Sequence, residues 1–83
     1  MPEIISREVL AEIMAEREYQ DQKWGGADHD KNHAAWDWLV YVLKFAGKAA
    51  TAVMAGDKVE ARRQFVKVAA LCVAALEHAP DLQ

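Results

Sequence analysis

Two lysines one helical turn apart are the first residues whose spacing points to chemistry. Lys44 and Lys48 flank Gly47 and follow Tyr41. Like charges at this spacing repel one another unless they share an anion. A glycine inside a helix costs about 0.8–1 kcal/mol relative to Ala, so Gly47 suggests close approach by another backbone or by a ligand. The pattern predicts an anion site, and the alternative is a solvated face with a packing glycine.

Three further bases lie on the next predicted helix, opposite the end of the helix that carries the two lysines: Arg62, Arg63 and Lys67. Lysine meets phosphate as a point charge, so a shared positive cleft would suit a phosphate group. The net charge of −3 argues against general nucleic-acid binding. Because residues 31–70 hold seven bases and three acids, a local anion site inside an acidic protein is still expected.

A second group of side chains has the residue types of a metal site. His29, His33 and Asp37 fall at i, i+4 and i+8, and they share one face if their helix begins early. Together with Glu16 and Asp21 they offer enough oxygen and imidazole ligands for one divalent cation, Mg²⁺ or Mn²⁺. The alternative is that these residues cap the helix and hydrogen-bond the loop, which fits the preferences of Asp and Asn at helix starts.

The aromatic residues predict both core packing and ligand contact. Trp36 and Trp38 are two positions apart, so they cannot face the same interior on a helix, and one should meet a partner subunit or a ligand ring. Trp24 or Tyr41 is suited to stack on a base. The sequence has no glycine-rich phosphate loop, nucleophile elbow or CxxC pair. Catalysis therefore has few candidates.

Three helices are expected to position these groups. Apolar residues recur with helical periodicity and no segment alternates long enough for a strand, so the fold class is all-α with one domain over 1–83. The predicted helices run from a Ser6 cap to about Gln22, over 31–55 and over 58–77, with short connections that make neighbours antiparallel. The expected boundary residues are Asp30 as a possible cap, Gly56 as a stop, and Asp57 as the acidic member of a capping box with Glu60.

The apolar faces predict a helical homo-oligomer. In the long central helix the repeating apolar face is formed by Trp36, Leu39, Val40, Leu43, Ala46, Ala50 and Val53, and Ala-rich faces of this helix and the last are expected to pack across a subunit interface. The last helix is apolar nearly all round after Lys67, and a chain of 83 residues cannot cover it alone. Cys72 in this run is expected to be a buried thiol in a reducing cytoplasm. Without a long apolar run or a signal-like start, neither membrane insertion nor export is expected.

With these residues in view, the chain resembles small phage and prophage-type proteins related to the MazG-like all-α nucleotide pyrophosphohydrolases. The matching stretches begin at Glu16-Arg17 and continue to Lys23-Trp24-Gly25, then run from Trp38-Leu39 to Gly47, and end over 64–70. The resemblance implies helical oligomers that bind nucleoside triphosphates beside Mg²⁺, which acids in an EExxE pattern and an ExxD pattern hold. In the matching register those acids are replaced by Lys44, Phe45, Lys48, Gln64 and Lys67.

Ammonium groups repel Mg²⁺, so the resemblance implies a nucleotide site without its metal and without hydrolysis. We therefore expect a non-catalytic protein with no cofactor that binds or sequesters a nucleotide-type molecule, in the host cytoplasm if it is phage-encoded. The expected ligand-binding residues are Lys44, Lys48, Lys67, Gln64, Tyr41, Trp24 and Arg17. Two alternatives stay open: a metal-dependent pyrophosphohydrolase that uses the histidine and carboxylate group, and a structural helical interaction module.

Overall fold

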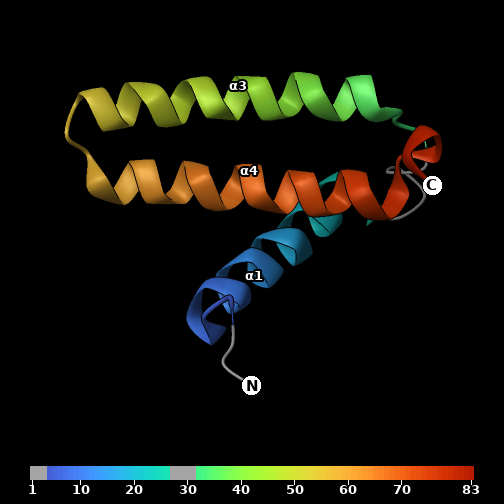
Figure 1. The fold of residues 1–83 in the computed structure, drawn as a ribbon, viewed down its shortest axis with the longest axis horizontal. Coiled ribbons are helices and arrows are strands. Elements are labelled where there is room, and N and C mark those ends of the chain that lie inside the picture. The colour runs from blue at the N-terminus through green and yellow to red at the C-terminus, as the bar shows by residue number, and fades with distance from the viewer. Residues whose placement is uncertain (1–3, 27–31) are drawn as a thin grey trace.

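The computed structural model describes residues 4–26 and 32–83, and within them the chain is all-helical (Figure 1). Helix α1 (Arg7–Trp24) packs obliquely on α4 (Lys58–His78), while α3 (Ala35–Met54) runs antiparallel beside α4 as a long hairpin. A short 3-10 turn, η1 (Pro80–Leu82), closes the open end of that hairpin. The predicted all-α class is confirmed, and no strand occurs in either described segment.

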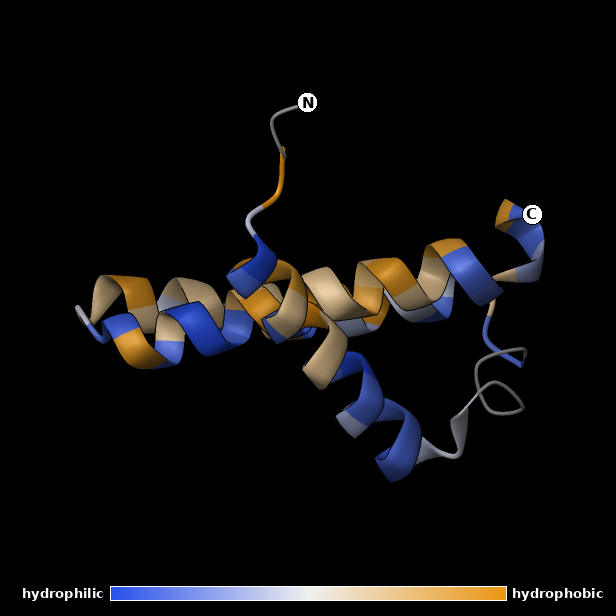
Figure 2. Cartoon of the chain, turned by 90° about the horizontal axis from the view of Figure 1, so that it is seen from below, coloured by the Kyte–Doolittle hydropathy of each residue, from blue (hydrophilic) through white to orange (hydrophobic). Residues whose placement is uncertain are grey.

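Helix α1 begins and ends where short-range signals place it. The Ser6 side chain accepts a hydrogen bond from the Val9 amide at 3.2 Å, which confirms the predicted cap. The helix ends two residues beyond the predicted Gln22, because Gly25 takes the left-handed conformation at φ 94° and donates its amide to the Asp21 carbonyl. The C-terminal half of this helix is hydrophilic (Figure 2).

The turn between α3 and α4 also follows the sequence. Gly56 has φ 73°, and Asp57 caps α4 by accepting from the Glu60 amide at 3.1 Å. Only half of the predicted capping box forms, because the Glu60 carboxylate bonds instead to the side chains of Arg63 and Gln64.

Helix α3 begins at Ala35, four residues later than predicted. The Asp37 carboxylate accepts from the Ala34 amide at 3.1 Å, and Asp81 of η1 accepts from the Ala35 amide at 2.8 Å. These two carboxylates satisfy two of the free amides at the helix start. The proposed Asp30 cap lies outside the described residues.

The buried core is small and lies at the η1 end of the hairpin. Trp38, Leu71, Ala74 and Ala79 form its centre, and partly buried aromatic residues pack around it. The Trp38 indole donates to the His33 carbonyl at 3.2 Å, so its polar edge is satisfied. Trp38 is 2% exposed and Trp36 is 69% exposed, which confirms that the two rings face different surroundings.

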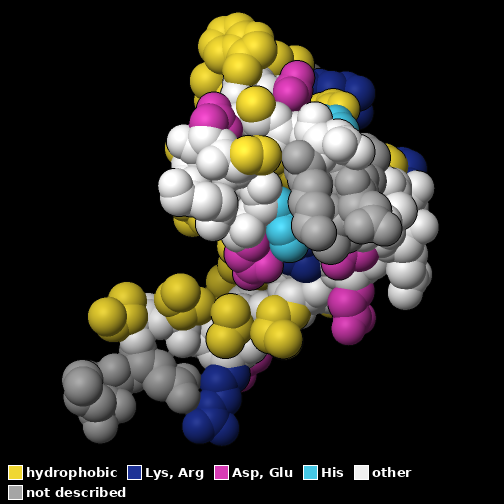
Figure 3. Space-filling model, turned by 90° about the vertical axis from the view of Figure 1, so that its right-hand side faces the viewer, with side chains coloured by type: hydrophobic (Ala, Val, Ile, Leu, Met, Phe, Trp, Pro, Cys, Tyr) yellow, Lys and Arg dark blue, Asp and Glu magenta, His cyan; other side chains and the backbone are white. Residues whose placement is uncertain are grey.

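One sequence prediction about burial is wrong for the single chain: Cys72 is exposed rather than buried. The predicted apolar face of the central helix is exposed in the single chain, including Leu43 and Val53, while Trp38, Ala49 and Ala52 are buried. Periodicity located an apolar face correctly, but it could not tell which surface that face would meet. An end view shows hydrophobic side chains gathered over α3 at the top and again lower down, near the start of α1 (Figure 3).

Candidate functional site

Three lysine ammonium groups gather around one aromatic ring. The Nζ atoms of Lys44, Lys48 and Lys67 lie 5.5, 5.2 and 5.1 Å from the centroid of the Phe45 ring. Phe45 is half-buried because it packs on the core near Leu71, and this fixes the ring. We call these four residues the lysine cluster. The structure thus brings together the three lysines that the sequence assigned to one anion site, from two different helices.

The charges of the lysine cluster are not neutralised by acids. No carboxylate among the described residues lies within ion-pair distance of Lys44, Lys48 or Lys67. The Phe45 ring offers each ammonium a cation–π contact of about 0.5–1 kcal/mol at such exposed positions. Mutual repulsion of three like charges opposes this gathering, so an anion with several oxygens would relieve it.

The surroundings of the lysine cluster differ on its two sides. Toward α1, Phe45 and Lys67 line an enclosed cavity of only about 30 Å³, which holds little more than water. A fourth ammonium is near this cavity, because Lys23 lies 5.7 Å from the Tyr19 ring centroid and also lines the cavity wall. Toward the α3–α4 turn, Lys48 borders a hollow of about 360 Å³. Of these two spaces, the hollow beside Lys48 is the one with the size of an ordinary small-molecule site.

Gln64 lies one turn before Lys67 and is 4% exposed. Its amide nitrogen donates to the Glu60 carboxylate at 2.6 Å, while its Oε1 is buried and has no hydrogen-bond partner among the described residues. Turning the amide over would set two oxygens against each other, so the observed orientation is the favourable one. Gln64 therefore carries an unused acceptor beside the lysine cluster.

The two aromatic residues predicted to stack on a base pack against each other. The rings of Trp24 and Tyr41 have centroids 6.2 Å apart and planes within 16°. Tyr41 also meets the rings of His33 and Trp38. A base cannot enter between Trp24 and Tyr41 at this separation, because insertion needs about twice the ordinary stacking distance. Only their outer faces and edges remain for a ligand.

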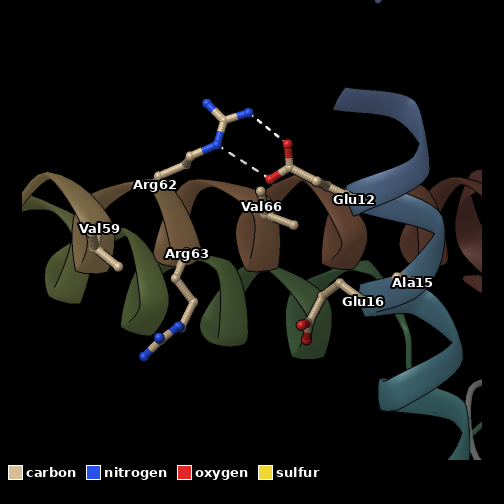
Figure 4. Close-up of a pocket in the computed structure, with 7 residues that line it drawn as sticks. All are labelled: Glu12, Ala15, Glu16, Val59, Arg62, Arg63 and Val66. Carbon is tan, nitrogen blue, oxygen red and sulfur yellow. Dashed lines mark hydrogen bonds and ion pairs between the residues drawn. The ribbon is translucent and has the colours of Figure 1, made fainter. Parts of the chain in front are cut away.

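The arginines that the sequence placed near the anion site bond to other side chains of the protein instead. Arg17 bonds within α1, to the Gln20 and Asp21 side chains at 3.2 Å each. Arg62 makes a two-point pair with Glu12 of α1, at 2.6 and 3.2 Å (Figure 4). The hydrogen bond to Glu12, and next its negative charge, raise the pKa of Arg62 above its ordinary value.

Arg63 pairs with Glu60 at 2.9 Å, so it is also neutralised by a carboxylate. Of the three bases expected on one positive cleft, only Lys67 joins the lysine cluster. Arg62 and Arg63 border a separate hollow of about 470 Å³ whose rim also carries Glu12 and Glu16 (Figure 4). The prediction of a shared cleft is therefore wrong for both arginines.

Gly47 does not sit at a close backbone approach in the single chain. A Cβ at this position would meet no atom within 4 Å. The predicted reason for a glycine here, contact with another backbone, is absent from the described residues. A bound ligand stays as the other explanation.

The alternative metal ligands do not converge within the described residues. Asp37 caps α3, Asp21 accepts from Arg17, and Glu16 accepts from Gln20. The His33 ring packs against aromatic rings. Over 4–26 and 32–83 no three His, Cys, Asp or Glu side chains are placed to hold one ion. His29 lies outside the described residues.

Sequence reasoning missed the role of Phe45, which it treated only as a replaced acid. A signal was present for one lysine, since Phe45 precedes Lys48 by three positions and helical spacing sets side chains three apart beside each other. The approach of Lys23 to the same region had no signal, because it depends on how α1 crosses the hairpin.

Comparison with known proteins adds no assignment: no model of a protein family, no curated protein and no solved structure matches the chain. The resemblance to MazG-like proteins accordingly stays an expectation. Among the described residues, no helix is both long and apolar enough to span a bilayer.

Proposed function

We propose that the protein binds a nucleotide or a nucleotide-derived signalling molecule without hydrolysing it, and that its phosphate is held by the lysine cluster. The observation that carries this proposal is the gathering of three ammonium groups within 5.5 Å of one ring centroid, without a carboxylate partner in the described part of the chain. A phosphate offers several anionic oxygens to separate ammonium groups at once. No divalent cation is needed to bring them together.

The nucleoside part has most room on the turn side of the lysine cluster. The hollow beside Lys48 is also lined by Thr51, Asp57 and Glu60, whose oxygens can accept hydrogen bonds from hydroxyl or amino groups. The small cavity toward α1 is too confined for a base. Stacking on the outer face of Trp24 or Tyr41 is the alternative placement for a longer or cyclic ligand.

A binder without turnover acts by lowering the free concentration of its ligand. The phage-type resemblance suggests a sponge that withdraws a nucleotide signal of host defence from its receptor. This role is drawn by analogy with the phage-type proteins.

We also propose that the chain associates with further copies of itself into a helical homo-oligomer. This association is supported by the exposed apolar side chains of α3 and α4, such as Leu43, Phe65 and Leu76, each at least 60% exposed. The same observation favours the alternative of a structural helical module whose apolar surface is its function. Absence of any small-molecule binding would decide for that module.

The test is calorimetry with ATP and with a cyclic dinucleotide, in EDTA, combined with native mass spectrometry to read the bound ligand. We expect binding in EDTA and recovery of intact ligand. Lys44→Glu should abolish the binding. Lys58→Glu is the matched control, because it makes the same charge change at an exposed lysine outside the lysine cluster.

Two results would contradict the proposal. Affinity that disappears on chelation and returns with Mg²⁺ would indicate a metal site. An equal loss in Lys58→Glu and Lys44→Glu would show that only overall charge matters.

A further inference from the structure

One side of the α3–α4 hairpin carries an uncovered stripe of apolar residues on each helix. On α3 the stripe repeats with alternating steps of four and three residues, and on α4 it does the same. Its members are Leu39, Leu43, Ala46, Ala50 and Val53 of α3, and Phe65, Ala69, Cys72 and Leu76 of α4. We call these nine residues the apolar flank.

The apolar flank is one surface rather than two. Ala46, Ala50 and Val53 line the same hollow of about 350 Å³ as Phe65 of the neighbouring helix. The other flank residues continue the same faces of α3 and α4 by helical spacing. Leu43, Phe65 and Leu76 are 60%, 62% and 69% exposed, so the fold of one chain leaves these three side chains largely uncovered. At the edge next to α1, Phe65 and Ala69 also line a hollow with Val9 and Ile13.

Steps of four and three residues are the spacing by which helices pack side by side along their length in coiled coils and helical bundles. In the single chain α3 and α4 already pack on each other through different residues, including Ala49, Ala52 and Ala61. Each helix therefore has a second packing surface, on the same side of the hairpin. Such a pair of helices lacks one further pair to complete a four-helix bundle.

From these observations we propose that the missing pair is the α3–α4 hairpin of a second copy, packed flank to flank about a two-fold axis. This inference rests on the proposed self-association and does not depend on nucleotide binding. It names the surface that joins the copies, which is the α3 and α4 flank and not the whole circumference of α4.

The area of the chain supports a second copy as the occupant. Its accessible surface is 5987 Å², whereas a folded monomer of 9.3 kDa is expected to expose only about 5,000 Å². The exposed side chains of the apolar flank contribute to this difference, and a standard interface buries roughly 800 Å² on each partner.

Shape and charge also suit an identical partner. Small residues, Ala46 and Ala50, floor the hollow, while Leu39 and Leu43 stand further along the same stripe. A two-fold axis that passes between these two parts of the stripe would set the large residues of each copy toward the small ones of the other. None of the nine flank residues is charged, and Lys44 and Lys48 lie away from it around α3, so no ammonium is desolvated.

The test is sedimentation equilibrium over a wide concentration range for the wild type and two matched variants. Leu43→Glu sets a carboxylate on the apolar flank. Val40→Glu sets the same group on α3 at a position that is also half-exposed but points away from the flank. We expect the wild type and Val40→Glu to form dimers, and the association of Leu43→Glu to be weakened by about 100-fold or more, since each dimer would bury two unpaired charges.

Alkylation of Cys72 gives a second readout that does not depend on a variant folding well. The thiol is exposed in the single chain and covered in the proposed dimer. Its reaction should slow as the wild-type concentration rises through the dimerisation range, and Val40→Glu should behave likewise.

The possible outcomes distinguish the flank interface from self-association in general. A wild-type chain that stays monomeric overturns both the flank interface and self-association. An oligomer that Leu43→Glu leaves intact, or in which Cys72 keeps one alkylation rate at every concentration, overturns the flank interface alone. Nucleotide binding by Lys44→Glu is measured separately and bears on neither.

Discussion

Replacing Phe45 by Leu tests whether one ring organises the lysine cluster. The change keeps an apolar side chain against the core but removes the aromatic face that three ammonium groups share. All charges stay the same. An effect on binding would therefore come from positioning rather than from net charge.

The magnitude follows from the contacts. Each cation–π contact at an exposed position contributes about 0.5–1 kcal/mol, and three ammonium groups on one ring contribute less than three times this because they repel. Loss of part of the ring volume adds a packing cost of about 1 kcal/mol. We expect a loss of about 1–2 kcal/mol from a stability of about 4–12 kcal/mol for a chain of this length, so the variant stays folded.

The affinity for ATP should fall more clearly than the stability of the fold. Without the shared ring, ordering each lysine around a phosphate costs about 0.5–1.5 kcal/mol, so we expect affinity for ATP to fall about tenfold or more. Thermal unfolding should shift by about 4–8 °C for each kcal/mol lost. Both are measured on the same samples, by circular dichroism and by calorimetry in EDTA.

The matched control is Phe65→Leu, the same change at an exposed ring on α4 that no lysine approaches within the described residues. It should leave the affinity for ATP unchanged. If Phe45→Leu binds ATP as tightly as the wild type, or if Phe65→Leu is equally impaired, the ring does not position the lysines.

Three further outcomes are expected. Gly47→Ala should stabilise the fold by about 0.8–1 kcal/mol because a Cβ meets open space there, whereas Gly56→Ala should destabilise it by about 1–2 kcal/mol because of its left-handed backbone, and urea unfolding compares the two. If Gly47→Ala also weakens ATP binding, a ligand lies against that turn of α3. Arg62→Gln should lower the melting temperature in dilute buffer but not in concentrated salt, since its pair with Glu12 is exposed and screened. Common nucleoside triphosphates with Mg²⁺ or Mn²⁺ should release no pyrophosphate, and sustained release in a pyrophosphate assay would establish the enzyme alternative.

The sequence predicts those parts of the fold that neighbours along the chain decide. Ser6 and Gly56 mark helix ends through hydrogen bonds and backbone conformations within a few residues. The start of α3 could not be predicted, because Asp81, 46 residues away, accepts from the Ala35 amide. Such a contact exists only once the hairpin has formed.

For the site, helical spacing was enough to pair Lys44 with Lys48, and the antiparallel hairpin brings Lys67 to the same ring. Spacing could not show that Arg62 would turn toward Glu12, since the crossing of α1 over α4 decides which carboxylate it meets. It also could not separate an apolar stripe that faces the chain's own core from one that faces outward, because both have the same period.

The bond between Asp81 and the Ala35 amide has a consequence for biosynthesis. Leu71, Ala74 and Ala79, which form most of the core, and the carboxylate that holds the start of α3 all come late in the chain. A ribosome that has released only α1 and α3 has exposed two helices that share no backbone contact. Folding should therefore wait until residue 81 has left the exit tunnel, and until then the nascent chain offers its apolar stripes to chaperones.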